Sequence, residues 1–463
     1  MLISRRSFIS RTSAGLIGYC ASHRPAPAST SADLLALAAA HVRLAEADRG
    51  RSVLWGRLGG SAAERTSARL FEKQIKPYVP KTKLEAFGFS AYRPTRLSLA
   101  IQGATSTTFV GSAMPTPFDA RFPAGAVQAP LVLIANDSDW GAAHGKWAFV
   151  RATMQGSPAR NSIRDGNLYK RAVVAGAVGL IFSLPMKPGR WRAVVPIDKA
   201  YALRDEAYPD KRRPLPCFCV DAHDGELLER PVSEGRSVAA SIEYEPGVER
   251  RGLNVVGYLP GKGQLGVALF NHLDSFFSGA NDNASGLATT VGLAGRLSRL
   301  PIEKRLADFF FVALSAHHDG AEGMRAFAER DPNRFANLTQ AILIEHTDAQ
   351  GGGEGKAAGW PTRLNDLRQA YLGNKGWPEV RDALPALVKD SGVMTVSPQA
   401  VDACIGDLLA VCDRQKSFSL IQAPPYYHTD HDTIDKISRA GLEASVDFHM
   451  RLLEVTGALR DVA

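Results

Sequence analysis

The chain has 463 residues and a formal net charge of +8, with 45% hydrophobic and 22% charged residues. These values are ordinary for a folded globular protein, and they exclude a disordered chain, a collagen-like repeat and a polytopic membrane protein. At roughly 100–200 residues per domain, the length predicts two or three domains. Arginines without opposing acids in residues 1–28 carry part of the charge, and no basic run elsewhere alternates with aromatics. We therefore expect no nucleic-acid partner.

The first residues have the layout of an export signal. The pair Arg5-Arg6 precedes a short apolar stretch, and Ala26-Pro27-Ala28 is a small-residue cleavage site. The apolar stretch is too short to span a bilayer. We predict a twin-arginine signal peptide over residues 1–28 and a periplasmic or secreted mature protein that begins near Ser29, with no integral membrane segment.

The mature chain begins with a helical pattern. Apolar residues recur at three- and four-residue spacing over 32–75, with a break at Gly59-Gly60. After this break, Ser61 and Glu64 have the spacing of a capping box, which predicts the start of a second helix.

From about residue 97 to 245 the pattern changes to short apolar runs separated by Gly, Pro and Asp. One helix is expected at 168–175. This stretch predicts a separate β-rich domain inserted into another one. The clearest strand-like runs are 131–134, 147–150, 178–182 and 238–242.

Five cysteines in an exported chain do not define a disulfide framework. Cys217 and Cys219 lie two apart in an apolar strand-like run, so we expect buried thiols there. Cys404 and Cys412 flank a short segment, and a disulfide between them is left open.

From residue 253 onward, strand-like and helix-like segments alternate. This alternation predicts an α/β fold with a mostly parallel central sheet flanked by helices. The run 308–314 is continuously apolar, which is typical of a strand covered on both faces. The other expected elements are strands at 265–270 and 341–344 and helices at 284–300 and 437–455.

Polar residues that can bind metal follow three of these strands. His272 and Asp274 come after the first strand, His317-His318 after the second, and Glu345 after the third. The carboxyl ends of parallel strands meet at one edge of a sheet, where ligands bind. Three strand ends that carry His or carboxylate side chains favour a metal site over isolated surface histidines.

Two further segments offer ligands. Asp282 lies just before a predicted helix, where it either caps that helix or points back to bridge two metal ions. His428 precedes the closing helix and adds one more imidazole.

The order of these motifs resembles the co-catalytic zinc exopeptidases of the bacterial leucyl aminopeptidase and aminopeptidase Y type. The specific part is the segment 279–286 after His272-x-Asp274, with Tyr427-His428-Thr429 near the end. The β-rich region resembles a protease-associated domain, with cues at 145–150, 175–179 and 215–217. Stretches 57–64 and 254–261 resemble the family's N-terminal helix pair and re-entry strand.

The resemblance implies a domain arrangement. Residues 31–98 and 249–463 form a zinc-exopeptidase-like catalytic domain. Residues 99–248 form an inserted protease-associated domain that covers the cleft and carries no catalytic ligand.

The resemblance also implies two zinc ions. Carried over position by position, His272, Asp282 and Glu345 would hold one ion. Asp282, His318 and His428 would hold the other. Asp274 would not bind a metal ion itself but would orient the His272 ring.

The chain departs from the family at two places. The family has two adjacent glutamates, a general base and then a metal ligand, where this chain has His317-His318. Neutral imidazole binds zinc, so His318 remains a candidate ligand. His317 then takes the place of the base, and Glu322 is an alternative base if its loop folds back. Glu345 stands where an aspartate is usual.

The function expected from the resemblance is metal-dependent hydrolysis of peptide bonds, with a peptide or small amide as substrate. Two alternatives stay open. One is a catalytically degenerate binding protein on the same scaffold with one zinc ion or none, because of His317-His318. The other is a hydrolase of a different amide.

Overall fold

The computed structural model describes most of the chain from residue 33 to 461. The predicted signal peptide over 1–28 lies outside the described residues, and so does Cys412, the proposed partner of Cys404. None of the helices in the described ranges is long and apolar enough to cross a membrane. The described ranges are 33–103, 106–115, 125–151, 167–184, 190–194, 215–234, 236–263, 265–347, 368–373, 376–391, 400–402, 404–410, 415–422 and 426–461.

The first sheet has eight described strands in the order β1-β10-β12-β11-β13-β16-β14-β15. Its centre is parallel, since β12, β11, β13 and β16 all run in one direction. β1 and β10 extend it on one side in antiparallel register. The strands are β1 (Lys81–Ser90), β10 (Glu249–Leu259), β11 (Leu265–His272), β12 (Ala307–Leu314), β13 (Gln340–Leu343), β14 (Arg368–Leu372), β15 (Ala400–Asp402) and β16 (Lys416–Gln422).

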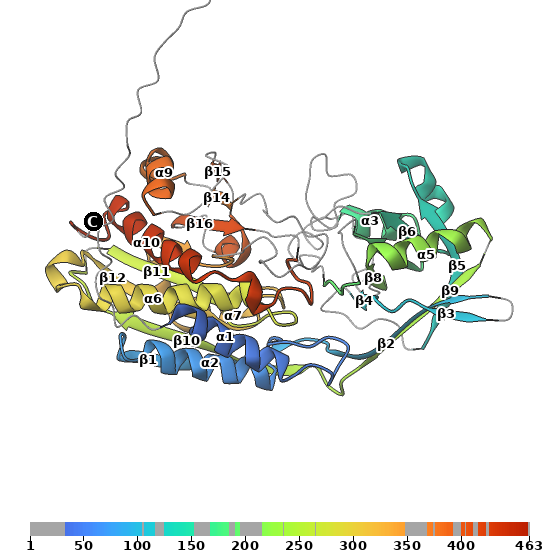
Figure 1. The fold of residues 1–463 in the computed structure, drawn as a ribbon, viewed down its shortest axis with the longest axis horizontal. Helices are drawn as coiled ribbons and strands as arrows, with labels where there is room; N and C mark the ends of the chain where they lie inside the picture. Colours follow the sequence, from blue (N-terminus) through green and yellow to red (C-terminus); the bar gives the residue numbers. More distant parts are fainter. Residues whose placement is uncertain are drawn as a thin grey trace, which may run out of the picture. The chain divides into compact units, whose positions relative to one another are not determined.

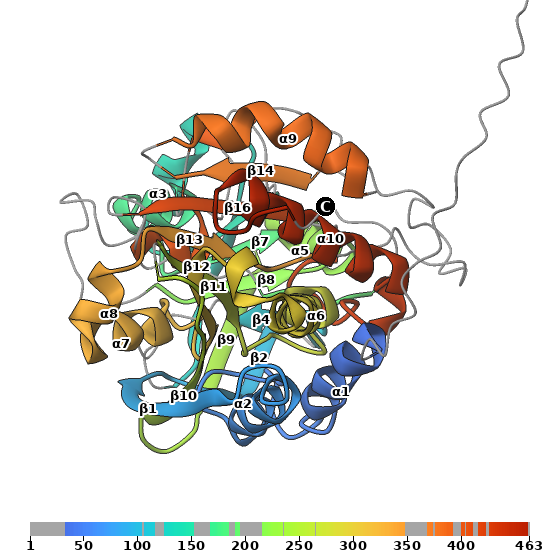
Figure 2. The same cartoon turned by 90° about the vertical axis from the view of Figure 1, so that its left-hand side faces the viewer.

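Helices cover both faces of this sheet (Figure 2). Alternation along β11 separates two cores: Val267 and Leu269 pack with α1, α2, α6, α9 and α10, whereas Ala268 and Phe270 pack with α7 and α8. The sheet is therefore buried on both sides, as the apolar runs predicted. The helices are α1 (Leu34–Glu46), α2 (Ala62–Ile75), α6 (Gly286–Arg299), α7 (Glu322–Arg330), α8 (Pro332–Ala336), α9 (Pro378–Ser391) and α10 (Arg439–Val455).

The predicted elements of this region are present, with shifted ends. The strand expected at 265–270 continues to His272, and the helix expected over 32–75 is interrupted by the loop 47–61. Only half of the predicted capping box forms. The Ser61 hydroxyl accepts a hydrogen bond from the Glu64 N–H, but the Glu64 carboxylate binds the N–H groups of Gly60 and Ala316 instead. Glu64 thus ties α2 to the segment that follows β12.

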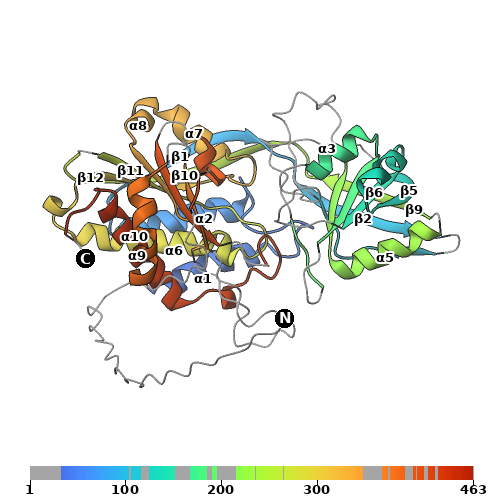
Figure 3. The same ribbon diagram turned by 90° about the horizontal axis from the view of Figure 1, so that it is seen from above.

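The second sheet is formed by residues between Pro94 and Tyr244, and Figures 1 and 3 show its strands with helices α3 and α5. Its order is β3-β2-β9-β5-β6-β7-β8-β4, with β5, β6, β7 and β8 parallel. α3 packs on one face of the parallel strands and α5 on the other. Cys217 and Cys219 lie buried in β8. The elements are β2 (Pro94–Gln102), β3 (Thr107–Phe109), β4 (Met114–Pro115), β5 (Val127–Ile134), β6 (Trp147–Arg151), α3 (Asn167–Val174), β7 (Gly179–Ser183), β8 (Cys217–Val220), α5 (Ala222–Ser233) and β9 (Ser237–Tyr244).

Candidate metal centre

The carboxyl ends of the central strands gather the predicted ligands. β11 ends at His272, which lies opposite Leu314 at the end of β12. Phe270, two residues earlier, lies opposite Leu343 at the end of β13. Since the three strand ends are level, the residues that follow β12 and β13 emerge beside His272.

Asp282 lies at the middle of this cluster. Its backbone is not helical (φ −112°, ψ 87°), so it is not part of the first turn of α6. One carboxylate oxygen, Oδ1, is 3.0 Å from His272 Nε2. The other, Oδ2, is 2.8 Å from His428 Nε2 and 3.4 Å from His318 Nε2. Of the two possibilities left open by the sequence, the structure therefore places this carboxylate among the imidazoles.

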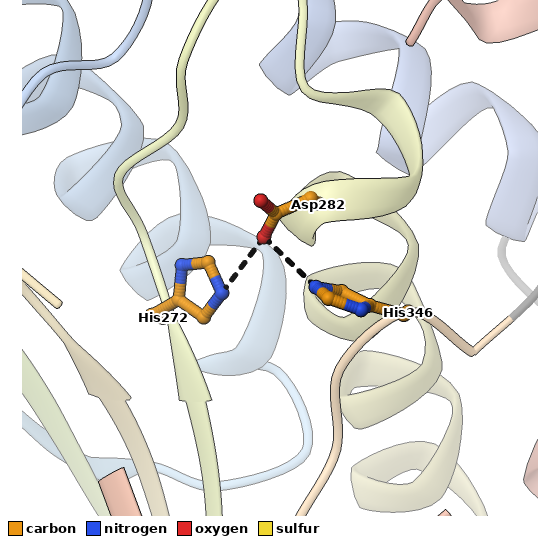
Figure 4. Close-up of side chains that lie close together, drawn as sticks. All are labelled: His272, Asp282 and His346. Atoms are coloured by element: carbon orange, nitrogen blue, oxygen red, sulfur yellow. Dashed lines mark ion pairs between the residues drawn. The ribbon is translucent and has the colours of Figure 1, made fainter. Parts of the chain in front are cut away.

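A fourth imidazole at Asp282 was not predicted. His346 Nε2 lies 3.1 Å from Asp282 Oδ1, on the opposite side from His272 (Figure 4). His346 follows Glu345 at the end of β13 and has a left-handed backbone, with φ +48°. In the sequence, His346 directly follows a predicted ligand at the end of a strand, and this position is the signal that could identify it as a further ligand. The resemblance assigns the preceding residue, Glu345, to the site instead.

Glu345 also reaches the cluster. Its Oε2 lies 3.3 Å from His272 Nε2, and its side chain is buried. The structure therefore brings together all five predicted ligands, His272, Asp282, His318, Glu345 and His428. Among the described residues, the groups that could hold a metal ion place His346 with His272 and Asp282, whereas they place Glu345 with His272 and His317.

The donor atoms fit a pair of metal ions. Two sets of three donors share Asp282: His272, Asp282 and His346 form one, and Asp282, His318 and His428 form the other. A tetrahedral zinc ion with donors at roughly 2.0–2.1 Å places neighbouring donors about 3.3–3.4 Å apart, close to the spacing here. His272 Nε2 and both Asp282 oxygens are buried without a hydrogen bond. Buried polar atoms are normally satisfied, so these atoms are suited to a cation.

The pKa values of the clustered side chains also favour a bound cation. Burial alone would lower the pKa of His272 and raise that of Asp282. Their neighbours reverse both effects, so that the pKa of His272 lies well above and that of Asp282 well below its ordinary value. Burial also opposes the shift of His318, yet the charges of Asp274 and Asp282 raise its pKa to about 9. Protons on these imidazoles balance the buried carboxylates, and a bound dication would displace them.

His428 differs from the other imidazoles of the cluster. Burial lowers its pKa to about 3, so its ring is neutral at physiological pH. A neutral imidazole has a free lone pair on one nitrogen, which is the form that binds metal.

Asp274 orients the histidines, although not only the one predicted. Its carboxylate accepts a hydrogen bond from His318 Nδ1 at 2.7 Å and others from the main-chain N–H groups of His317 and His318. His272 Nδ1 is 3.0 Å from the main-chain oxygen of Asp274 and 3.5 Å from its carboxylate. Asp274 thus holds His318 by its side chain and His272 chiefly by its backbone.

His317 occupies the place of the expected base. Its ring stacks on that of His272, with centroids 4.2 Å apart, and its Nδ1 lies 2.9 Å from Asp407 Oδ2. Glu322, the alternative base, begins α7 and pairs with Arg325, and it belongs to none of the metal-binding groups found among the described residues. His317 is therefore the better placed of the two.

The fold and the site define an α/β protein with buried histidines and carboxylates around Asp282 at one edge of its central sheet. Residues 254–452 match the family model of Peptidase family M28. The match contains every predicted ligand.

Solved structures with the same fold cover most of the chain. One is a zinc aminopeptidase from Bacillus subtilis, with a TM-score of 0.63, 18% identity and coverage of 92% of this chain and 95% of the other. Another is a Peptidase M28 precursor from Shewanella amazonensis, with a TM-score of 0.66, 19% identity and coverage of 92% and 94%. An aminopeptidase from Aneurinibacillus sp. gives a TM-score of 0.56 at 19% identity, with coverage of 91% and 96%. No curated protein matches the chain significantly.

Proposed function

We propose that the protein is an exported zinc exopeptidase of the aminopeptidase type, with two metal ions bridged by Asp282. The observation that carries the proposal is the position of the Asp282 carboxylate, whose two oxygens face two different sets of buried imidazoles. The match of residues 254–452 to a peptidase family supports the reaction type.

The residues divide into two groups of ligands and one proton acceptor. His272, with Glu345 or His346, would hold the first ion, and His318 with His428 the second. When bound, zinc supplies Lewis acidity, which lowers the pKa of water and polarises a carbonyl group. Nε2 of His317 takes the proton from the attacking water, and His317 then returns this proton to the leaving amine. Burial of the centre keeps bulk water away from these charges.

The inserted region is proposed to be a protease-associated domain over residues 99–248. The segment 190–194 supports a role beside the site, because it pairs with the loop that carries His428. Val194 N–H donates to the His428 oxygen, and Asp430 N–H donates to the Arg192 oxygen.

Asp430→Ala removes the acceptor of the Arg192 N–H. We expect a changed KM at unchanged zinc content, and loss of zinc would contradict the assignment.

Metal content and turnover test the reaction together. Wild-type protein should hold two zinc ions and release amino acids from peptides or aminoacyl-anilides. Asp282→Ala and His428→Ala should lose zinc, whereas His317→Ala should keep it and lose turnover by roughly 10²–10⁴-fold. Two zinc ions in Asp282→Ala would contradict the shared-carboxylate centre.

The same experiment separates the rivals. Folded protein that binds one zinc ion or none and cleaves nothing would be a binding protein on this scaffold. Two zinc ions without peptide cleavage would point to another amide substrate, such as an acylated amino acid.

Export is tested separately. Replacement of Arg5 and Arg6 by Lys should leave precursor in the cytoplasm if the twin-arginine route is used. Unchanged export of this variant would contradict that route.

A further inference from the structure

Asp407 belongs to none of the metal-binding groups found among the described residues, but its partner His317 belongs to one, with His272 and Glu345. Asp407 lies in the short 3₁₀ turn Gly406–Ala410 and is fully buried. Its Oδ2 is 2.9 Å from His317 Nδ1, whereas its Oδ1 is buried without a hydrogen bond among the described residues. A buried carboxylate needs a partner, and here that partner is the imidazole of His317.

This contact fixes which nitrogen of His317 carries the proton. An ionised carboxylate only accepts hydrogen bonds, so His317 Nδ1 must donate. In the neutral ring Nε2 then has the free lone pair. A nitrogen of His317 lies within 4.8 Å of donor atoms of His272 and Glu345. Since Asp407 engages Nδ1, Nε2 is the nitrogen left to face that side.

The turn that carries Asp407 packs directly on the centre. A methyl group placed on Gly406 would lie 3.2 Å from Glu345 Oε1 and 3.4 Å from His317 Cε1. Gly406 has φ +53°, a conformation that favours glycine. The backbone of the turn therefore packs against the side chains of Glu345 and His317. Asp407 contacts the His317 ring at its Nδ1 atom.

The two adjacent histidines are held in parallel ways. His318 donates through Nδ1 to Asp274 at 2.7 Å, and His317 donates through Nδ1 to Asp407 at 2.9 Å. Each ring thus has a carboxylate of its own. A glutamate base needs no such partner, because its two oxygens are equivalent, whereas an imidazole must be set in one tautomer and one orientation.

We propose that Asp407 is a positioning residue for His317, and that it holds the ring as the Nδ1–H tautomer with Nε2 directed at the reacting water. The proposal rests on the proposed function, since it assigns His317 the proton transfer. It explains how an imidazole can replace a carboxylate at this position of the fold.

The test compares Asp407→Ala and Asp407→Asn in the full mature protein loaded with zinc. Loss of an outer partner of a site residue typically costs about 10–100-fold in activity. We expect Asp407→Ala to lower kcat by this amount while KM and zinc content stay at wild-type values. Asp407→Asn keeps an acceptor oxygen with nearly the same shape and should recover part of the loss.

A spectroscopic readout reports the tautomer without turnover. In protein labelled with [¹⁵N]histidine, the His317 signals are assigned by their absence in His317→Gln. In wild-type protein loaded with zinc, the Nδ1 that contacts Asp407 should carry the proton. In Asp407→Ala the ring should become a mixture of tautomers. Leu408→Ala is the matched control, because Leu408 is buried in the same turn and belongs to the apolar core. It should lower stability and leave the tautomer unchanged.

The outcomes are distinct. Wild-type kcat and an unchanged tautomer in Asp407→Ala would overturn the proposal. So would loss of zinc in Asp407→Ala with unchanged turnover per bound zinc, because Asp407 would then support a metal ligand. If wild-type protein binds zinc and cleaves nothing, the proposed function fails. The nitrogen spectra would still decide whether Asp407 sets the ring.

Discussion

Asp432 Oδ2 accepts a hydrogen bond from the main-chain N–H of Asp282 at 3.0 Å. The other oxygen of Asp432 accepts one from the Asn281 N–H at 2.8 Å, and its main-chain oxygen accepts one from Ala280. Asp432 lies four residues after His428. These bonds therefore tie the loop of one metal ligand to the turn of the bridging one.

The variant Asp432→Ala should release this turn. It leaves two buried N–H groups without acceptors, at a cost of about 1–3 kcal/mol each. We expect a lower free energy of unfolding in urea and a zinc affinity reduced at least tenfold. Asp432→Asn keeps one acceptor and should lie between Ala and wild type. Equal zinc affinity in all three proteins would show that Asp282 holds its position without Asp432.

A second prediction concerns the adjacent residues Glu345 and His346. His346 Nε2 is as close to Asp282 as His272 Nε2 is, at 3.1 and 3.0 Å. We expect His346→Ala to lower the affinity for the first zinc ion at least tenfold. The affinity for the second ion, held by His318 and His428, should not change. Chelator competition and metal analysis measure both.

Glu345→Gln provides the comparison, and His144→Ala, at an exposed histidine of the second sheet region, controls for loss of an imidazole. If His346→Ala binds both ions like wild type while Glu345→Gln does not, Glu345 alone completes the first set. That result would restore the assignment that the sequence suggested.

Much of the site could be predicted because its residues directly follow buried strands. His272, His318 and Glu345 come within four residues of apolar runs, and parallel strands bring such positions together. His346 was missed because nothing in the sequence indicates the left-handed backbone that turns its ring toward Asp282. Asp407 was missed because it lies 90 residues from His317 in a turn without a recognisable motif.

The part of the first sheet beyond β13 was also not predicted from the sequence. In β16 the buried positions include Ser417 and Ser419, so an apolar alternation is weak there. The Ser419 hydroxyl is satisfied by the main-chain oxygen of Leu343. Polar residues that are buried through such hydrogen bonds look like surface residues in a sequence.

A third prediction concerns Arg57, which is fully buried. Its guanidinium donates to the main-chain oxygens of Leu273, Ser278 and Gly279, at 2.9–3.1 Å, and so holds the stretch between His272 and Asp282. Arg57→Lys keeps the charge but cannot span these acceptors. We expect the free energy of unfolding to fall by about 2 kcal/mol or more, since hydrogen bonds from charged groups contribute about 1.5–3 kcal/mol each. The exposed Arg43→Lys is the control, and equal losses in both variants would contradict this role.

The last prediction is a pH dependence that originates in α1. His41 is fully buried between α1 and α2, where its Nδ1 lies 2.7 Å from Ser67 Oγ and its Nε2 3.0 Å from Gln74 Oε1. Burial is the main cause that lowers its pKa from 6.5 to about 3, and the nearby charge of Arg57 acts in the same direction. The folded protein therefore keeps this ring neutral at a pH where the unfolded chain already binds a proton.

The direction of the pH dependence follows from this difference in pKa between the folded and the unfolded chain. Stability from His41 is fully present above pH 6.5 and is lost as the pH falls from 6.5 toward 3, by at most about 1.4 kcal/mol per pH unit. Between pH 7.5 and 5.0, His41 should account for a loss of about 2 kcal/mol. In His41→Gln this part of the slope should be absent, whereas exposed His144→Gln should follow wild type. Urea unfolding of metal-free protein at both pH values measures the difference. Parallel curves for wild type and His41→Gln would show that His41 does not set the acid sensitivity of the fold.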